Sequence, residues 1–405
     1  MTSSSLRKRK KRLRILKNKR VLLGITGGIA AYKSIDLARR LRDEGASVVV
    51  AMTEAAKQFV TPLSLEVASQ NKVYTSLFDE PMAHISLPSS ADVMVIAPAT
   101  ADIIAKFAHG IADDLLSTCF LSYSGKVVIA PSMNWRMYEN RIFGENLRKL
   151  LSTGVVQVGP ERGDLACGEE GIGRMAEPAE IVETVKSALT EKDLAGEKMV
   201  ITAGPTREYL DPVRFISNRS SGKMGYALAR AARDRGASVI LISGPSYLKK
   251  PQGVGFVGVE TSAQMMKSVK QSVQGDTTVL VMAAAVADFL PAVTSRTKIE
   301  KTGDLNIPFR QTEDIISSVL GAGKRPYVIG FAAETGNNLA RAQKKMKVKN
   351  MDMVVFNDVT EAGAGFDVDT NKVVIIDRKG KTRLEVMSKD SVADAIFDRF
   401  IEIKA

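Results

Sequence analysis

Short apolar runs alternate with segments of helical spacing along most of the chain. Residues 21–26 (VLLGIT) are apolar and end at Gly27-Gly28, and residues 30–44 then place apolar side chains at the spacing of a helix. Gly45 ends this predicted helix, and residues 48–52 form the next predicted strand. A strand, a helix and a second strand in this order are typical of an open, doubly wound α/β domain.

The same pattern returns in the second half of the chain, at residues 199–243. The segments RDEGASVVV (42–50) and RDRGASVIL (233–241) match closely, but the turn between strand and helix is longer by 13 residues in the second unit. Open α/β sheets bind ligands at this turn, so the inserted PTREYLDPVRFISNRSSGK is a candidate site by position. We therefore predict two doubly wound, Rossmann-like α/β domains with mostly parallel sheets.

The domain boundary is expected near residues 176–197, which resemble a terminal helix followed by a polar connector. This predicts a basic arm at 1–20, a first domain at 21–190 and a second at 191–405. The other predicted strands all end in small or polar residues, which leave room for a ligand: 93–99, 126–132, 278–285, 327–333 and 351–358.

Charge and cysteine content exclude several classes of protein. The formal net charge is +12, but residues 1–20 contain ten Lys or Arg, and the rest of the chain carries only +2. We expect a solvated arm, with an organelle transit peptide left open, and the neutral body gives no reason to expect nucleic acid as a partner. Two cysteines make no disulfide framework, and no apolar run is long enough to span a membrane. We therefore expect a cytoplasmic protein.

The first half offers an anion site without a dinucleotide fingerprint. Gly27 and Gly28 place backbone N–H groups near a helix N-terminus. A dinucleotide site would also place an acid at the end of the second strand, where this chain has Thr53. The pattern favours a mononucleotide cofactor.

Further candidate residues follow the next two strands and a later glycine-rich stretch. PATADI (98–103) and PSMNWRMYEN (131–140) present Thr100, Asp102, Met133 and Asn134 along one edge of the predicted sheet. His84 precedes a buried strand, and a lone histidine there could equally be a loop residue with no role in chemistry. Cys167 lies in GDLACGEEGIGRM (163–175), where a mobile lid carrying a proton donor is favoured over a structural cysteine.

TGGIAAYK, HISL, PATAD, PSMN and ACGEEGIGRM occur in an order and spacing that resembles the flavin-dependent cysteine decarboxylases, specifically the phosphopantothenoylcysteine decarboxylase half of bifunctional coenzyme A biosynthesis proteins. The resemblance implies FMN, a catalytic role for His84, binding of the substrate carboxylate by Asn134, and Cys167 as proton donor. In this chemistry the flavin oxidises the thiol to a thioaldehyde, which serves as electron sink for the loss of CO₂. The predicted cofactor-binding residues are Gly27, Gly28, Thr53, Pro98, Thr100, Asp102 and Met133.

The second half lacks a GxxxxGK[ST] phosphate loop, which excludes a P-loop enzyme of the usual form. TAGPTREYLDPVRFISNRSSGKMG, AAVADF and GFAAET resemble the phosphopantothenate–cysteine ligase half of the same family. The resemblance implies CTP, an acyl-cytidylate handled by Asn218, and charge stabilisation by Lys298. Asp288 would hold Mg²⁺ or Mn²⁺, and the predicted CTP site comprises Met282, Ala283, Ala284, Asp288, Lys298, Phe331, Lys345 and Lys349. Glu300 departs from the family's KxKK pattern.

Two other classes of function remain as alternatives. One is a nucleotide-binding regulatory or scaffold protein, and the other is a two-domain NAD(P) oxidoreductase, which lacks a well-placed ribose acid in both units. The residues do not decide between CTP and ATP. The resemblance also implies a homo-oligomer, with trimers through the decarboxylase and dimers through the ligase, which could close into a dodecamer. The expected partners are otherwise the small-molecule substrates phosphopantothenate, cysteine and CTP.

Overall fold

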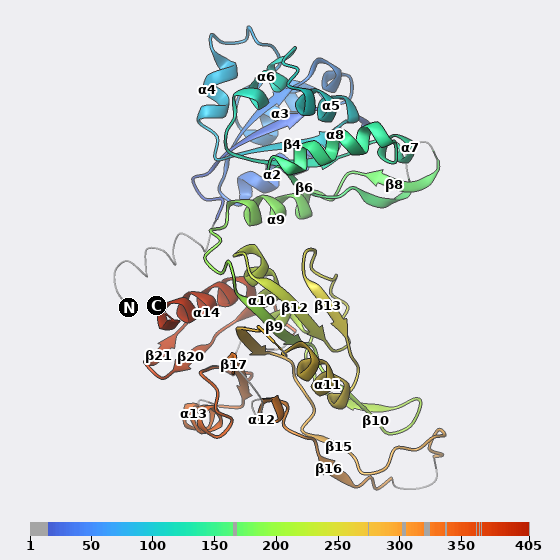
Figure 1. Ribbon diagram of the computed structural model, residues 1–405, viewed down its shortest axis with the longest axis vertical. Helices are drawn as coiled ribbons and strands as arrows, with labels where there is room; N and C mark the ends of the chain where they lie inside the picture. The colour runs from blue at the N-terminus through green and yellow to red at the C-terminus, as the bar shows by residue number, and fades with distance from the viewer. Residues whose placement is uncertain are drawn as a thin grey trace. The chain divides into compact units, whose positions relative to one another are not determined.

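The computed structural model divides the chain into two compact units at Thr190 and Glu191. The structure describes residues 15–164, 168–273, 275–301, 305–319, 325–336, 338–361, 363, 365 and 367–404. Each unit is built around its own sheet with helices on both faces (Figure 1). The two doubly wound α/β units that the sequence predicts are therefore confirmed.

The first unit contains a wholly parallel six-stranded sheet in the order β3-β2-β1-β4-β5-β6. This order reverses direction between β1 and β4, the switch point at which doubly wound sheets bind ligands. The strands are β1 (Arg20–Ile25), β2 (Ser47–Met52), β3 (Val73–Tyr74), β4 (Val93–Ala99), β5 (Lys126–Pro131) and β6 (Val156–Gln157).

Alternate residues of these strands face two separate cores, because side chains of a strand point to opposite faces. Leu23 and Ile25 pack with one set of helices, and Leu22 packs with the other. The first set is α2 (Lys33–Asp43), α3 (Pro62–Ser69) and α9 (Pro178–Leu189). The second set is α4 (Ala83–Ser89), α5 (Ala101–His109), α6 (Leu115–Ser122) and α8 (Arg141–Ser152).

Short elements complete the ligand edge of this sheet. The helix expected at 30–44 begins as a 3₁₀ turn, η1 (Ile29–Tyr32), before α2. A second 3₁₀ turn, η2 (Glu54–Gln58), follows β2, and the four-residue α7 (Trp135–Tyr138) follows β5. An antiparallel hairpin of β7 (Glu161–Asp164) and β8 (Glu170–Arg174) stands apart from the sheet.

The second unit has an eight-stranded sheet in the order β13-β12-β9-β14-β17-β18-β20-β21. The first six strands are parallel, β20 pairs antiparallel with β18, and β21 pairs antiparallel with β20. The strands are β9 (Lys198–Ala203), β12 (Ser238–Ser243), β13 (Gly255–Gly258), β14 (Val279–Met282), β17 (Tyr327–Glu334), β18 (Met353–Asp358), β20 (Val374–Asp377) and β21 (Gly380–Arg383).

Helices again cover both faces of this sheet. The cores on the two faces are formed with α10 (Lys223–Asp234) and α14 (Lys389–Lys404) on one side. On the other side lie α11 (Ser262–Ser272), α12 (Ile315–Val319) and α13 (Leu339–Val348). A two-stranded pair of β19 (Thr370–Asn371) and β22 (Met387–Ser388) precedes α14.

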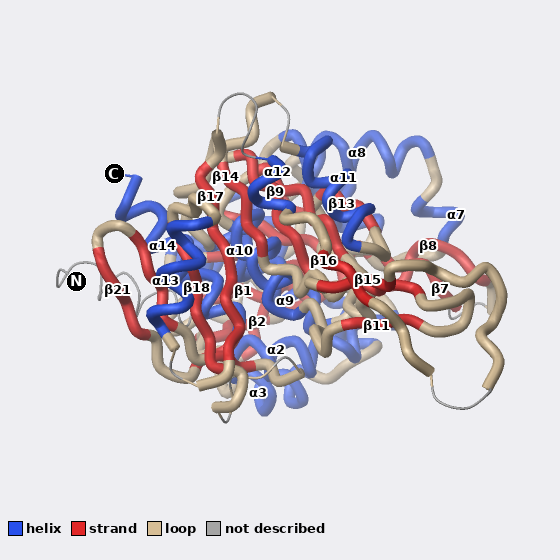
Figure 2. The backbone as a smooth tube through the Cα atoms, turned by 90° about the horizontal axis from the view of Figure 1, so that it is seen from below, coloured by secondary structure: helices blue, strands red, loops and turns tan. Residues whose placement is uncertain are grey.

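The inserted segment of the second unit folds into a hairpin, which the sequence did not predict. Its strands are β10 (Arg207–Tyr209) and β11 (Phe215–Ser217). A second small pair, β15 (Phe289–Pro291) and β16 (Phe309–Gln311), lies beside it, away from the main sheet (Figures 1 and 2).

The strand expected at 278–285 is shorter in the structure and ends at Met282. Beyond it, Ala284 N donates to the hydroxyl of Thr202 at 3.1 Å, and Ala285 N donates to Gly204 O at 2.9 Å. These bonds turn the chain away from β17 and toward β9, which ends the ladder.

Candidate active sites

A cavity of about 1120 Å³ opens at the carboxyl ends of β1, β2, β4 and β5. Pockets for small ligands span roughly 300–1,000 Å³, so this cavity has room for a mononucleotide. Seven of the predicted site residues line it: Gly27, Gly28, Thr53, Thr100, Asp102, Met133 and Asn134. They lie far apart in the sequence, and the parallel sheet brings them to one edge.

The first turn of the cavity requires glycine at one position. A Cβ placed on Gly27 would lie 2.5 Å from the Cβ of Ala55, closer than two carbon atoms can approach. Gly28 has more room, since a Cβ placed there would lie 3.6 Å from Thr100 Cγ2, and it directly precedes η1. The backbone can therefore approach a ligand closely here.

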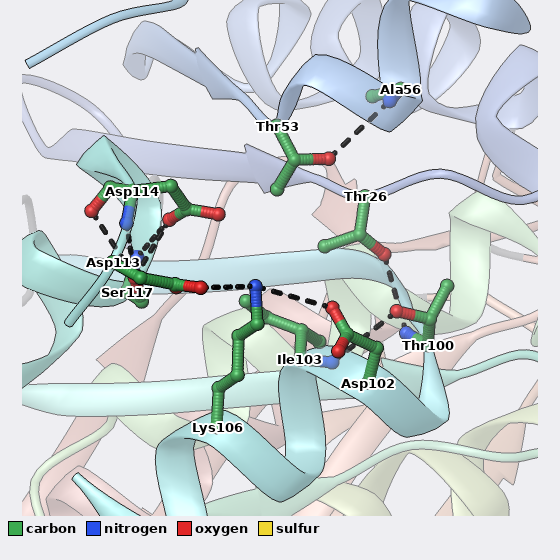
Figure 3. Close-up of polar contacts among 10 residues, drawn as sticks. All are labelled: Thr26, Thr53, Ala56, Thr100, Asp102, Ile103, Lys106, Asp113, Asp114 and Ser117. Carbon is green, nitrogen blue, oxygen red and sulfur yellow. Dashed lines mark hydrogen bonds and ion pairs between the residues drawn. The ribbon is translucent and has the colours of Figure 1, made fainter. Parts of the chain in front are cut away.

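Threonine hydroxyls hold the surrounding loops together (Figure 3). The hydroxyl of Thr26, which is buried, donates to Pro98 O at 2.7 Å and accepts from Thr100 N at 3.2 Å. Thr100 accepts from Ile103 N at the start of α5, and Thr53 caps η2 in the same way. Pro98, a predicted site residue, therefore supports the loop and is not one of the residues that line the cavity.

Lys106 is a cation of the cavity wall that the sequence analysis missed. Its Nζ lies 3.1 Å from Asp113 Oδ2 and 3.5 Å from Asp102 Oδ2 (Figure 3). Burial lowers the pKa of Lys106, but the hydrogen bond to Asp113 and the charge of Asp102 raise it more, so the net pKa lies above its ordinary value. The spacing Asp102–Lys106, one helical turn, was a signal for this pair.

Lys33 is a second cation of the cavity wall that the sequence analysis missed. Its position on the apolar face of a predicted helix was a signal, because a charged residue there is buried and needs a partner. It is 8% exposed, and its Nζ donates to Met175 O at 3.2 Å and to Glu177 Oε1 at 2.9 Å. Arg174 contacts the same Glu177 oxygen at 2.9 Å. The hydrogen bond from Lys33 holds the pKa of Glu177 below its ordinary value.

The β7–β8 hairpin docks on the segment that carries Asn134. Met133 N donates to Gly173 O at 3.0 Å, and a Cβ on Gly173, whose φ is +157°, would lie 2.1 Å from Met133 O. Asn134 caps α7, its side-chain oxygen accepting from Arg136 N at 2.9 Å. Cys167, the predicted proton donor, lies outside the described residues.

His84 is another predicted site residue that does not line the cavity. It lies half-buried in α4, and its backbone carbonyl accepts from Ser122 Oγ at 2.7 Å. It is not among the described residues that line the cavity.

In the second unit four of the predicted nucleotide residues, Met282, Ala283, Ala284 and Phe331, lie in or directly after β14 and in β17. Met282 pairs with Gly330 across the two strands, so Ala283 and Ala284 follow β14 next to Phe331. Asn218 reaches the same segment, where its side-chain amide donates to Ala285 O at 3.0 Å and Val286 O at 3.3 Å.

Of two further predicted lysines, Lys345 lies in α13 and Lys349 is the residue that caps its C-terminus. Lys345 Nζ lies 3.4 Å from Phe331 O, and burial followed by the charge of Lys349 lowers the pKa of Lys345. Lys349 forms an ion pair with Asp314, a partner that the sequence analysis missed. The negative charges of Glu334 and then Asp288 partly offset the lowering of the Lys345 pKa.

Lys298 is exposed and lies in the connection between β15 and β16. Within the described ranges, no hydrogen bond or ion pair joins it to the other predicted nucleotide residues.

The residues that the structure describes also contain no group of three or more His, Cys, Asp or Glu side chains that could hold a metal ion by themselves. None of the described helices is long and apolar enough to cross a membrane.

Comparison with known families divides the chain at the same place. Residues 9–190 match the family model described as Flavoprotein, and residues 194–403 match that of the DNA/pantothenate metabolism flavoprotein C-terminal domain. A crystal structure is known for the C-terminal domain of a coenzyme A biosynthesis bifunctional protein, CoaBC, whose sequence is 37% identical to the matched part of this chain. The match covers 53% of this chain and 98% of that domain, with a TM-score of 0.45.

Curated relatives match along almost the whole chain. The coenzyme A biosynthesis bifunctional protein CoaBC of Vibrio cholerae is 44% identical over 389 residues, which cover 94% of this chain and 97% of the relative. The protein of the same name from Escherichia coli K12 is 44% identical, covering 95% of this chain and 97% of the relative. This chain belongs to the family of coenzyme A biosynthesis bifunctional proteins.

Proposed function

We propose that this chain catalyses two consecutive reactions of coenzyme A biosynthesis. The second unit ligates 4'-phosphopantothenate to cysteine through an acyl-cytidylate formed from CTP. The first unit decarboxylates the product, 4'-phosphopantothenoylcysteine, to 4'-phosphopantetheine with FMN. The observation that carries the proposal is the match to bifunctional relatives over 94% of this chain and 97% of their length, which leaves neither unit unaccounted for.

The first unit fits a flavin mononucleotide. The cavity combines a glycine turn for close approach to a phosphate with an apolar and hydroxyl-lined wall, and Thr53 stands where a dinucleotide site would place an acid for the ribose. When bound, FMN supplies the two-electron chemistry that the loss of CO₂ requires. Asn134 would hold the substrate carboxylate, and Cys167, on the connection between β7 and β8, would return a proton.

The position of His84 supports an assembly of several copies. Because His84 lies away from the cavity of its own unit, its catalytic role requires that a neighbouring copy present it. We propose that this neighbouring copy belongs to a trimer formed through the first unit. The family resemblance adds dimers through the second unit, which would close the assembly into a dodecamer. Sedimentation velocity of the purified protein tests this, and a monomer at the enzyme's working concentration would contradict it.

The second unit fits a triphosphate. Lys345 and Lys349 lie at one sheet edge with small residues that admit a nucleotide, and cationic clamping is the main requirement of nucleotidyl transfer. Mg²⁺ is usually held by one or two carboxylates together with substrate phosphates, so the single carboxylate of Asp288 fits a metal that arrives with the nucleotide. Asn218 would act on the acyl-cytidylate and Lys298 on the phosphorus under attack.

Product analysis by mass spectrometry tests the proposal. The protein is incubated with phosphopantothenate, cysteine, Mg²⁺ and either CTP or ATP, and its flavin is identified by its yellow absorption. We expect 4'-phosphopantetheine with CTP, an accumulated acyl-nucleotide with Asn218→Asp, and a stalled decarboxylation with Cys167→Ser. The proposal fails if wild-type protein forms no product with either nucleotide. Variants that behave like the wild type would refute the residue roles alone.

A further inference from the structure

Asp211 is a fully buried carboxylate in the β10–β11 hairpin, although several neighbouring side chains are exposed. Its side chain is 0% exposed, whereas Val213 and Phe215 in the same turn are 60% and 41% exposed. It lies between β10 and β11, in the segment inserted before α10. A buried charge is costly unless it is fully hydrogen-bonded, so its partners indicate what it does.

The two carboxylate oxygens have different tasks. Oδ1 accepts from Val213 N and Arg214 N, both at 2.8 Å, and so closes the β10–β11 turn. Oδ2 accepts from Ile299 N at 3.1 Å, from a residue 88 positions later in the chain, and also lies 3.7 Å from Arg214 Nη1. Ile299 directly follows Lys298.

Two further hydrogen bonds join the residues that precede Asp211 to the residues that precede Ile299. Ser295 N donates to Leu210 O at 2.9 Å, and Thr294 Oγ1 donates to Tyr209 O at 3.2 Å. Burial alone raises the pKa of Asp211, but the N–H groups of Ile299, Val213 and Arg214 together lower it below its ordinary value. The carboxylate therefore stays ionised as an acceptor.

We infer that Asp211 is the positioning residue of the Lys298 segment in the ligase reaction, holding Ile299 N through Oδ2 so that Lys298 stands at a fixed place. The inference rests on the proposed function. Residues 292–301 form no helix or strand, so the position of the Lys298 segment depends on individual contacts such as those with Asp211, Leu210 and Tyr209. A cation that stabilises developing charge must be placed before the reaction, and an unanchored segment would lose that placement to conformational entropy.

Asp211→Asn separates the two tasks of the carboxylate. The asparagine oxygen can still accept from Val213 N and Arg214 N, which preserves the turn. Its side-chain NH₂ group would face the backbone N–H of Ile299, and two donors cannot form a hydrogen bond. The contact with the Lys298 segment is therefore lost. Lys345 in α13 and Lys349 at the C-terminal end of this helix are left unchanged.

We expect Asp211→Asn to lower kcat for pyrophosphate release from CTP by tenfold to a hundredfold, with the KM for CTP changed less than threefold. We also expect faster tryptic cleavage after Arg296 and Lys298 in the native protein, with the melting temperature of the second unit maintained. The matched control is Asp377→Asn. Asp377 closes the β20–β21 turn through Lys379 N and Gly380 N, but its third partner is Arg399. Asp377 lies opposite Met353 at the start of β18, whereas the candidate nucleotide site lies at the other end of that strand.

A double variant shows whether Asp211 acts through Lys298. Asp211→Asn combined with Lys298→Met is expected to be no slower than Lys298→Met alone, whereas multiplied effects would overturn the inference. Unchanged kcat in Asp211→Asn, or unchanged cleavage after Arg296 and Lys298, would also overturn it. Failure of the proposed function is distinguishable, because wild-type protein would then release no pyrophosphate while the cleavage assay would still report the anchoring.

Discussion

The indole Nε1 of Trp135 donates a hydrogen bond of 2.7 Å to Glu169 Oε2, and this bond ties the β7–β8 hairpin to the segment that carries Asn134. Arg136 Nη2 contacts the other oxygen of the same carboxylate at 2.8 Å. The hairpin comes so close that a Cβ on Gly171 would lie 2.7 Å from Trp135 Cβ. Glu169 directly precedes β8, so this contact holds the β8 end of the hairpin against Trp135.

We expect Glu169→Ala to loosen the β7–β8 hairpin. The pair is partly exposed, so its loss is worth roughly 1 kcal/mol, about a fivefold rise in the open population. Hydrogen exchange of the amides at 170–174 should accelerate by that factor, and decarboxylation should slow while FMN stays bound. Glu170→Ala is the matched control, since Glu170 pairs with Arg162 within the hairpin. Equal exchange rates in both variants would contradict the docking role.

Lys106→Met is expected to weaken FMN binding. The substitution leaves Asp102 and Asp113 without their shared cation at the cavity wall, which disfavours an anionic ligand. Loss of affinity of about tenfold, or ~1.4 kcal/mol, should appear in fluorescence titration of apoprotein with FMN. Lys106→Arg keeps the charge and should bind nearly as the wild type does. An unchanged Kd for Lys106→Met would rule out this electrostatic role.

The nucleotide affinity of the second unit should fall as the pH rises in the alkaline range. Burial and the charge of Lys349 lower the pKa of Lys345 from its ordinary value of 10.5, and a triphosphate needs the protonated form. Below the lowered pKa the amine is charged and binds the nucleotide, and above it this contribution is lost. The KM for CTP measured against pH checks this. Lys345→Arg should show a flatter profile, and identical profiles would exclude Lys345 as the titrating group.

Arg235→Met should destabilise the second unit strongly. Arg235 is 0% exposed and holds both oxygens of Asp193, at 2.8 and 3.0 Å, while its Nη1 contacts Asp398 at 3.0 Å. Removing one partner of a buried ion pair costs about 3–5 kcal/mol. Urea unfolding followed by circular dichroism measures the loss.

Arg40→Met is the control for that substitution. It breaks an exposed i,i+4 pair with Asp36 on α2, and exposed pairs contribute little to stability. Its unfolding midpoint should remain close to that of the wild type. If Arg235→Met unfolds no more easily than Arg40→Met, the buried pair does not stabilise the unit.

Local patterns along the chain suffice to predict both doubly wound units and most of the first cavity. Apolar runs of strand length, glycine stops and helical spacing are properties of short segments, so the elements near Gly27, Thr100 and Asn134 can be placed from the amino-acid sequence alone. Parallel strands end at one edge of a sheet, and this rule gathers these residues correctly.

Which side chains meet across long stretches of chain depends on tertiary packing. No local pattern indicates that Asp211 holds Ile299 N, that Lys33 reaches Glu177, or that His84 lies outside the cavity of its own unit. These contacts depend on how separate elements pack, and packing is set by the whole core. Local periodicity records which face of an element is buried, but it does not record the distant partner that the buried face will meet.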